Sequence, residues 1–144
     1  MFITYPVIFT DVKNNILIEV PDLGILTEAN SENEAKGSLA DAIAVARDAI
    51  GINCITREDE GKEINKPSPI EKIDASKGTF AEDGKSFVSM VDVDLTAYRK
   101  KLDNKAVRRN VTLPNWLNIE ADKAGINVSG LLQEALMQKM GVSR

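Results

Sequence analysis

A chain of 144 residues with 43% hydrophobic and 28% charged residues has the composition of a soluble globular protein, long enough for one ordinary domain plus a small one. No apolar run approaches the roughly 18 residues of a membrane-spanning helix, and the first residues do not resemble a secretion signal, so we expect a cytoplasmic protein. The sequence contains no histidine and one cysteine, which excludes histidine-based catalysis, histidine-ligated zinc and an internal disulfide.

The charge is unevenly distributed along the chain. Residues 105–144 contain six cations and three anions, a net charge of +3, and subtracting this from the total of -4 leaves -7 for residues 1–104. A basic segment attracts polyanions, and an acidic body attracts basic proteins. The charge pattern therefore indicates a polyanion as partner of the last forty residues and a basic protein as partner of the rest.

The first thirty residues predict a meander of three strands. β-Branched and aromatic residues dominate residues 2–12, and the lysine and two asparagines that follow can form a tight turn into a second strand at residues 16–20. A proline-aspartate turn then leads to a third short strand at residues 25–28. Pro6 fits an edge position better than a central one, because proline has no N–H to donate to a neighbouring strand.

A helix is predicted to follow the meander. Ser31 and Glu34 have the spacing of a capping box, and we expect the helix to end at Gly51 or to fray through Ile55. Its apolar residues recur at helical spacing, namely Ala35, Leu39, Ala42, Ile43, Ala46 and Ile50. The small residues in this stripe predict close packing of the helix on one face of the meander.

The composition changes over residues 56–85, which are charged and rich in proline and glycine. This segment predicts a long surface excursion, with short strands at residues 70–73 and at Thr79 and Phe80. Residues 87–93 alternate as a fourth strand does, and Asp94 can cap a short helix that ends near residue 102. Residues 1–104 therefore predict an α+β domain of βββαβ type.

The last forty residues predict a strand followed by two helices. The strand covers residues 107–113 and stops at Pro114, whose fixed φ suits the first turn of a helix. Gly125 sits where a left-handed cap would end that helix, and Asn127 can cap a second helix that ends before Gly141. A lone strand leaves its backbone groups unpaired, and about forty residues cannot bury a stable core, so we expect this unit to dimerise through an antiparallel ribbon.

This order of elements, with its V-T-L-P join and its G-I-N-V-S-G-L-L turn, resembles the ribbon-helix-helix repressors of the Arc and MetJ type. The resemblance implies that the ribbon enters the DNA major groove with its outward face, here Arg108, Asn110 and Thr112, toward the bases. Other DNA contacts expected on this basis are to phosphates, from Arg109 and from the start of the last helix at Asn127, Val128 and Ser129. An alternative stays open, in which the two helices only dimerise and Arg108 and Arg109 are solvated.

The first hundred residues resemble the N-terminal domain of HicB antitoxins. The motifs that carry this resemblance are Tyr5-Pro6, Pro21-Asp22, Gly24, Thr27, Glu34-Ala35, Lys66-Pro67-Ser68 and the passage from Val91 to Arg99. The chain departs from the family pattern at Leu23-Gly24-Ile25, where proline, glycine and cysteine are usual, and at Ala29, where glycine is common. The resemblance implies a partial RNase H-like domain over residues 1–104 and a ribbon-helix-helix domain over residues 105–144.

True nucleases of the RNase H-like fold gather about four carboxylates around two divalent cations. The candidates here are Asp11, Glu19, Asp22, Asp92 and Asp94, and the rest of a two-metal set is not evident. We therefore expect a protein without enzymatic activity, metal or cofactor.

The family resemblance implies a function for both domains. It predicts an antitoxin that binds and neutralises a HicA-type toxin, a small basic ribonuclease that cleaves mRNA, with Asp11 and Asp22 as candidate contacts. It also predicts a homodimer that represses its own operon by binding operator DNA. The alternatives are a stand-alone ribbon-helix-helix repressor whose N-terminal domain senses a ligand or serves assembly, and a metal-dependent nuclease with a DNA-binding tail.

Overall fold

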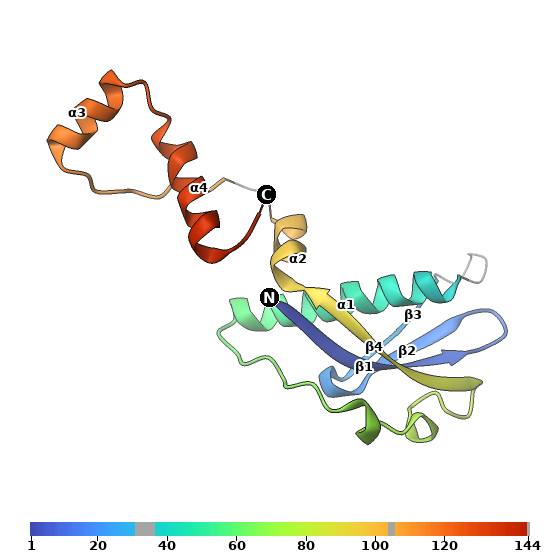
Figure 1. Cartoon of the computed structure of the whole chain (residues 1–144). Helices are drawn as coiled ribbons and strands as arrows, with labels where there is room; N and C mark the ends of the chain where they lie inside the picture. The colour runs from blue at the N-terminus through green and yellow to red at the C-terminus, as the bar shows by residue number, and fades with distance from the viewer. Residues whose placement is uncertain (31–36, 104–105, 144) are drawn as a thin grey trace. The chain divides into compact units, whose positions relative to one another are not determined.

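The structure is a computed structural model that describes residues 1–30, 37–103 and 106–143. It has a mixed α+β fold, and the chain divides into two compact units, Met1–Asp103 and Asn104–Arg144. Figure 1 shows the elements of each unit. None of the helices in the described ranges is both long and apolar enough to cross a membrane.

The first unit contains an antiparallel four-stranded sheet. Its strands are β1 (Phe2–Asp11), β2 (Ile16–Val20), β3 (Ile25–Glu28) and β4 (Lys85–Asp94), in the order β3-β2-β1-β4 (Figure 1). The predicted meander and fourth strand are therefore confirmed, and β4 returns beside β1. Pairing of β1 with β2 begins at Ile8, which is opposite Glu19, so Pro6 lies in a part of β1 that pairs with β4 alone.

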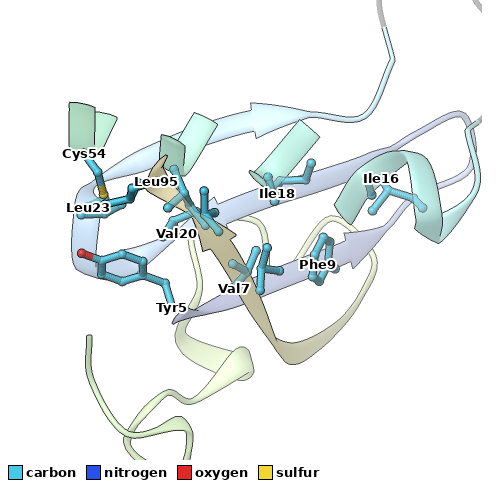
Figure 2. Close-up of a cluster of buried hydrophobic side chains, with 14 residues drawn as sticks. Tyr5, Val7, Phe9, Ile16, Ile18, Val20, Leu23, Cys54 and Leu95 are labelled. Carbon is cyan, nitrogen blue, oxygen red and sulfur yellow. The ribbon is translucent and has the colours of Figure 1, made fainter. Parts of the chain in front are cut away.

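The core of this unit follows from the period of two along the strands. Tyr5, Val7 and Phe9 of β1 are fully buried on the face that helix α1 (Leu39–Asp59) covers, together with the alternate residues of β2 (Figure 2). The small residues Ala42 and Ala46 of α1 are also fully buried, so the helix packs closely on the sheet as the sequence predicts.

Both ends of α1 differ from the prediction. Ser31 and Glu34 lie outside the described residues, and the helix begins later, where Ser38 and Asp41 form a reciprocal capping box. The predicted end at Gly51 is wrong, because the helix continues to Asp59. Gly51 is a point of close packing instead: a Cβ at this position would be 2.9 Å from the ring of Tyr98. The glycine that the sequence analysis interpreted as a helix end is thus explained by the space that the Tyr98 ring occupies.

Part of the excursion after α1 lies against the second face of the sheet, near Ile8 and Glu19. It contains two 3-10 turns, η2 (Ile70–Lys72) and η3 (Ala75–Lys77). The short strands predicted at residues 70–73 and at Thr79 and Phe80 are wrong, because η2 occupies the first position and a turn the second. Side chains rather than a strand ladder hold this segment: the N–H and Oγ1 of Thr79 each donate to the Glu19 carboxylate at 2.8 Å. Prolines in the segment lack the N–H groups that a ladder needs.

Helix α2 (Leu95–Leu102) begins as predicted, since the Asp94 carboxylate accepts from the N–H groups of Thr96 and Ala97. Arg99 of α2 pairs with both Glu58 and Asp59 at the end of α1, each at 2.9 Å. The Arg99 side chain therefore ties α2 to α1.

The second unit contains α3 (Asn115–Lys123) and α4 (Val128–Met140). Gly125 adopts φ of 67°, and the Asn127 side chain accepts from the N–H of Gly130, so both predicted caps are present. Residues 106–114 form no regular element, whereas the sequence predicts a strand at 107–113. A strand is defined by pairing with a neighbour, and the described part of a single chain offers this segment none.

Candidate functional site

The second unit has almost no core of its own in a single chain. None of the side chains described in residues 106–143 is buried, and large apolar side chains are exposed, including Val107 at 81%, Trp116 at 67% and Met140 at 69%. Soluble monomers rarely expose apolar surface on this scale, and such surfaces usually mark an interface. The unit therefore has an exposed apolar surface that another polypeptide segment can bury.

One apolar groove lies between the extended segment and α4. Val111 and Leu113 form one wall, and four residues of α4, namely Val128, Leu131, Leu132 and Ala135, form the other, around a cavity of about 250 Å³. Val107, Val111 and Leu113 are the apolar residues that alternate with Arg108, Asn110 and Thr112 and so form the inward face of the predicted strand, and two of them line the groove. The third, Val107, is exposed. The groove is open and wholly apolar in side-chain character, which suits another apolar segment.

The predicted base-reading residues are on the surface of this segment. Arg108, Asn110 and Thr112 are exposed, as is Arg109, and none of the four forms a hydrogen bond or ion pair with another described residue. Their donor and acceptor groups are therefore available to a ligand.

The predicted phosphate-binding residues lie at the start of α4. Asn127 precedes the helix, and its side-chain oxygen is held by the Gly130 N–H at 3.1 Å, while Val128 and Ser129 form the first turn. The first N–H groups of a helix have no intrahelical acceptor and lie at the positive end of its dipole. This geometry is compatible with the phosphate contact that the sequence predicts, although the Asn127 oxygen is used for capping.

The two candidate toxin contacts are not neighbours. Asp11 ends β1 opposite Ile16, whereas Asp22 lies in the turn after β2, so the length of β2 separates them. Both carboxylate oxygens of Asp22 accept hydrogen bonds from Ser68, one from its N–H at 2.8 Å and one from its hydroxyl at 2.6 Å. Asp22 therefore holds the excursion against the end of the sheet. The Lys66-Pro67-Ser68 motif was the available sequence signal, but nothing in it identified Asp22 as its partner.

The remaining candidate carboxylates also have protein partners. Asp92 pairs with Arg47 at 3.0 Å, Asp94 caps α2, and Glu19 binds Thr79. Within the described residues, no group of three or more carboxylates or other metal-ligating side chains could hold a metal ion. Four of the five candidate carboxylates, Glu19, Asp22, Asp92 and Asp94, thus have local structural roles.

The one cysteine is part of the core. Burial raises the pKa of the Cys54 thiol, and burial likewise raises the pKa of the neighbouring Tyr5, whose hydroxyl donates to the backbone oxygen of Asn65. Both groups therefore stay protonated at neutral pH. Cys54 acts as a small buried side chain of the core.

Comparison with known proteins identifies the family. The family described as "HicB_like antitoxin of bacterial toxin-antitoxin system" matches residues 5–136, a range that begins in β1 and ends in α4. The chain belongs to this HicB-like antitoxin family. The match extends over most of both units and ends within α4.

A solved structure supports the same fold. A chain of the "Toxin-Antitoxin complex from Streptococcus pneumoniae" is 24% identical to this HicB-like chain, with a TM-score of 0.57, and the likeness covers 96% of this chain and 99% of that one. At this level of identity the likeness concerns the fold alone. No curated protein matches the chain.

Proposed function

We propose that this HicB-like protein is an antitoxin that binds and neutralises a HicA-type ribonuclease toxin and represses its own operon as a homodimer. Membership of the antitoxin family supports the first part. The second part is carried by one observation: an uncovered apolar groove lies beneath the extended segment whose Arg108, Asn110 and Thr112 are exposed. The antitoxin family also suggests a regulator without enzymatic activity or cofactor.

Dimerisation is the step that turns the extended segment into a ribbon. A second copy of residues 107–113 would pair antiparallel with the first and supply the missing backbone partners. The same pairing brings together two apolar grooves, each lined by Val111, Leu113 and α4. A second copy of the chain thus buries the apolar groove that is open in a single chain. The resulting dimer has a ribbon-helix-helix domain over residues 105–144.

In this dimer the exposed triplet faces a DNA ligand. Arginine suits guanine, asparagine suits adenine, and threonine accepts mixed contacts, so Arg108, Asn110 and Thr112 are our proposed base-reading residues. Arg109 and the start of α4, at Asn127 to Ser129, are proposed phosphate contacts. The net charge of +3 on residues 105–144 favours binding to the polyanion.

The partial RNase H-like unit is the proposed toxin-binding module. Its net charge of -7 over residues 1–104 favours association with a small basic ribonuclease. Asp11 is exposed and stays a proposed contact. The Asp22 carboxylate accepts hydrogen bonds from Ser68. We therefore propose that Asp22 contributes to toxin binding indirectly, by fixing the position of the excursion.

The experiment is co-purification of the full chain with the product of the adjacent gene. We expect a stable complex with a small basic protein, and loss of that protein's RNA cleavage in the complex. A neighbouring gene without such a product, together with operator binding by the chain alone, would favour the stand-alone repressor instead.

A further inference from the structure

Helix α1 has one side that nothing in the described structure covers. Its first side lies on the sheet, and its second lies against α2 (Figure 1). There the ring of Tyr98 covers Gly51. The third side carries Ala49, Ile52, Asn53 and Thr56, which are all uncharged. A solvated helix face is normally charged or strongly polar. An uncharged stripe with Ile52 at 51% exposure therefore has the character of an interface.

This stripe forms a groove with the edge of the sheet. The groove has a volume of about 460 Å³ and lies between Ile25 of β3 and the third side of α1, with Arg57, Glu60 and Lys62 at its border. Asn53 lines it, and the buried Oδ1 of Asn53 has no donor among the described residues. The groove thus has a mixed lining, apolar at Ile25, Ala49 and Ile52 and polar toward its border, and a buried acceptor on Asn53 lacks a hydrogen bond.

The backbone of β3 beside the groove is unpaired on its outer side. The N–H of Ala29 donates to the oxygen of Ile16 at 2.9 Å, and antiparallel pairing alternates, so Ile25, Thr27 and Ala29 turn their backbone groups toward β2. The N–H and C=O groups of Leu26 and Glu28 therefore point away from the sheet. Since β3 is the edge strand, no described strand meets them.

The opposite edge of the sheet is protected. At β4, the Arg47 side chain donates from Nε to the backbone oxygen of Asp92 at 2.8 Å and from Nη2 to its carboxylate at 3.0 Å. A charged side chain over an edge is a common means of preventing further strand pairing. The two edges therefore differ at these positions, and the groove lined by Ile25 and α1 adjoins the β3 edge.

We propose that the β3 edge and its groove bind an extended segment of the basic toxin, which adds to the sheet as a fifth strand. Backbone groups of that segment pair with those of Leu26 and Glu28, and one of its apolar side chains enters the groove against Ile25 and Ile52. The charge of -7 on residues 1–104 favours a basic polypeptide over a second acidic copy of this unit. This inference rests on the proposed toxin-binding function and locates the toxin-binding site at the β3 edge.

Two variant pairs test the site in the full chain, with the purified product of the adjacent gene as the probe. Leu26→Pro removes an outward N–H that no described strand uses, whereas Leu26→Ala keeps it. Ile52→Lys places a charge in the groove, whereas Leu102→Lys places one at a side chain of α2 of similar exposure, 54%, that does not line the groove. We expect the first member of each pair to weaken toxin binding by about tenfold or more and the second to bind like the wild type.

Amide hydrogen exchange of the wild-type chain tests the site without a substitution, so the result does not depend on whether a variant folds. In the complex, exchange at Leu26 and Glu28 should slow, and in the free chain it should be fast at every protein concentration. Slow exchange that depends on concentration in the free chain would show a second copy at this edge and overturn the inference. Wild-type affinity in both Leu26→Pro and Ile52→Lys would overturn it while leaving the antitoxin function intact. Failure of the wild type to bind the probe would overturn both.

Discussion

The ring of Tyr98 lies directly against the backbone of Gly51, and this contact is what allows α2 to pack on α1. A Cβ added to Gly51 would be 2.9 Å from the ring carbons, which is closer than such atoms approach in folded proteins. Glycine is therefore required here for space rather than for backbone conformation.

The first prediction concerns this contact. Gly51→Ala should lower the free energy of unfolding by up to about 2 kcal/mol, because an overpacking cost of about 1–3 kcal/mol outweighs the roughly 1 kcal/mol by which alanine favours a helix. Urea denaturation measures the change. In a Tyr98→Leu background, where the flat ring is absent, the same substitution should be neutral or stabilising. A more stable Gly51→Ala protein in the wild-type background would contradict the packing argument.

A second prediction concerns the hydrogen bonds between Asp22 and Ser68. Ser68→Ala removes the 2.6 Å hydroxyl bond to a partly buried carboxylate, and we expect a loss of about 1–2 kcal/mol in unfolding free energy. Ser76→Ala is the matched control, since the Ser76 hydroxyl also donates at 2.6 Å, to Asp74, but in an exposed turn. Its effect should be clearly smaller. Equal losses in the two variants would show that Asp22 does not hold the excursion.

The third prediction is a pH dependence at the start of α1. Hydrogen bonds from the N–H and hydroxyl of Ser38 lower the pKa of Asp41 below its usual value of about 3.9. Because the folded pKa is lowered, the stabilisation is fully present above the unfolded pKa and is lost as the pH falls through the folded one. The stability difference between wild type and Asp41→Asn should therefore shrink between pH 6 and about pH 2.5. A difference that stays constant would exclude a role for the ionised carboxylate.

The fourth prediction tests the dimer by the period of two. Leu113→Asp places a charge in the apolar groove beside α4 and should yield monomers in sedimentation analysis at concentrations where the wild type is a dimer. Thr112→Asp changes the adjacent outward residue and should leave the dimer intact while abolishing DNA binding. If Thr112→Asp dissociates the dimer as well, the assignment of inward and outward faces is wrong.

The fifth prediction separates base contacts from phosphate contacts. Arg108→Ala and Asn110→Ala should each cost about 1–3 kcal/mol of operator binding and relax sequence preference, whereas Arg109→Ala should weaken operator and random DNA alike and reduce the salt slope by about one. Titrations on both DNAs at several salt concentrations measure these effects. Equal weakening on operator and random DNA by the first two variants would exclude them as base-reading residues.

Much of the first unit could be predicted from local patterns. β-Branched and aromatic residues, turn residues and apolar alternation located all four strands, and the capping side chain of Asp94 marked the start of α2, because these signals act over a few residues. The cap at Asn127 marked the start of α4 in the second unit in the same way. The end of α1 could not be predicted, since Gly51 is explained by Tyr98, which lies forty-seven residues further along the chain. Asp22 and Ser68 illustrate the same limit for the candidate site.

The groove between Ile25 of β3 and α1 could not be predicted from the sequence either. Ile25 and Ile52 lie in different elements, and neither residue has a local pattern that marks an interface. Only the placement of α1 beside β3 brings them together. For residues 107–113 the limit is different, because the segment's predicted strand requires a second chain, and the described part of one chain leaves it irregular.

The most direct test of the antitoxin function is titration of the toxin's ribonuclease activity with the purified full-length protein. RNA cleavage by the product of the adjacent gene should fall linearly and reach zero near one antitoxin chain per toxin molecule, and Leu113→Asp should inhibit equally although it no longer binds operator DNA. Cleavage that is unchanged at a several-fold excess of the protein would contradict the account.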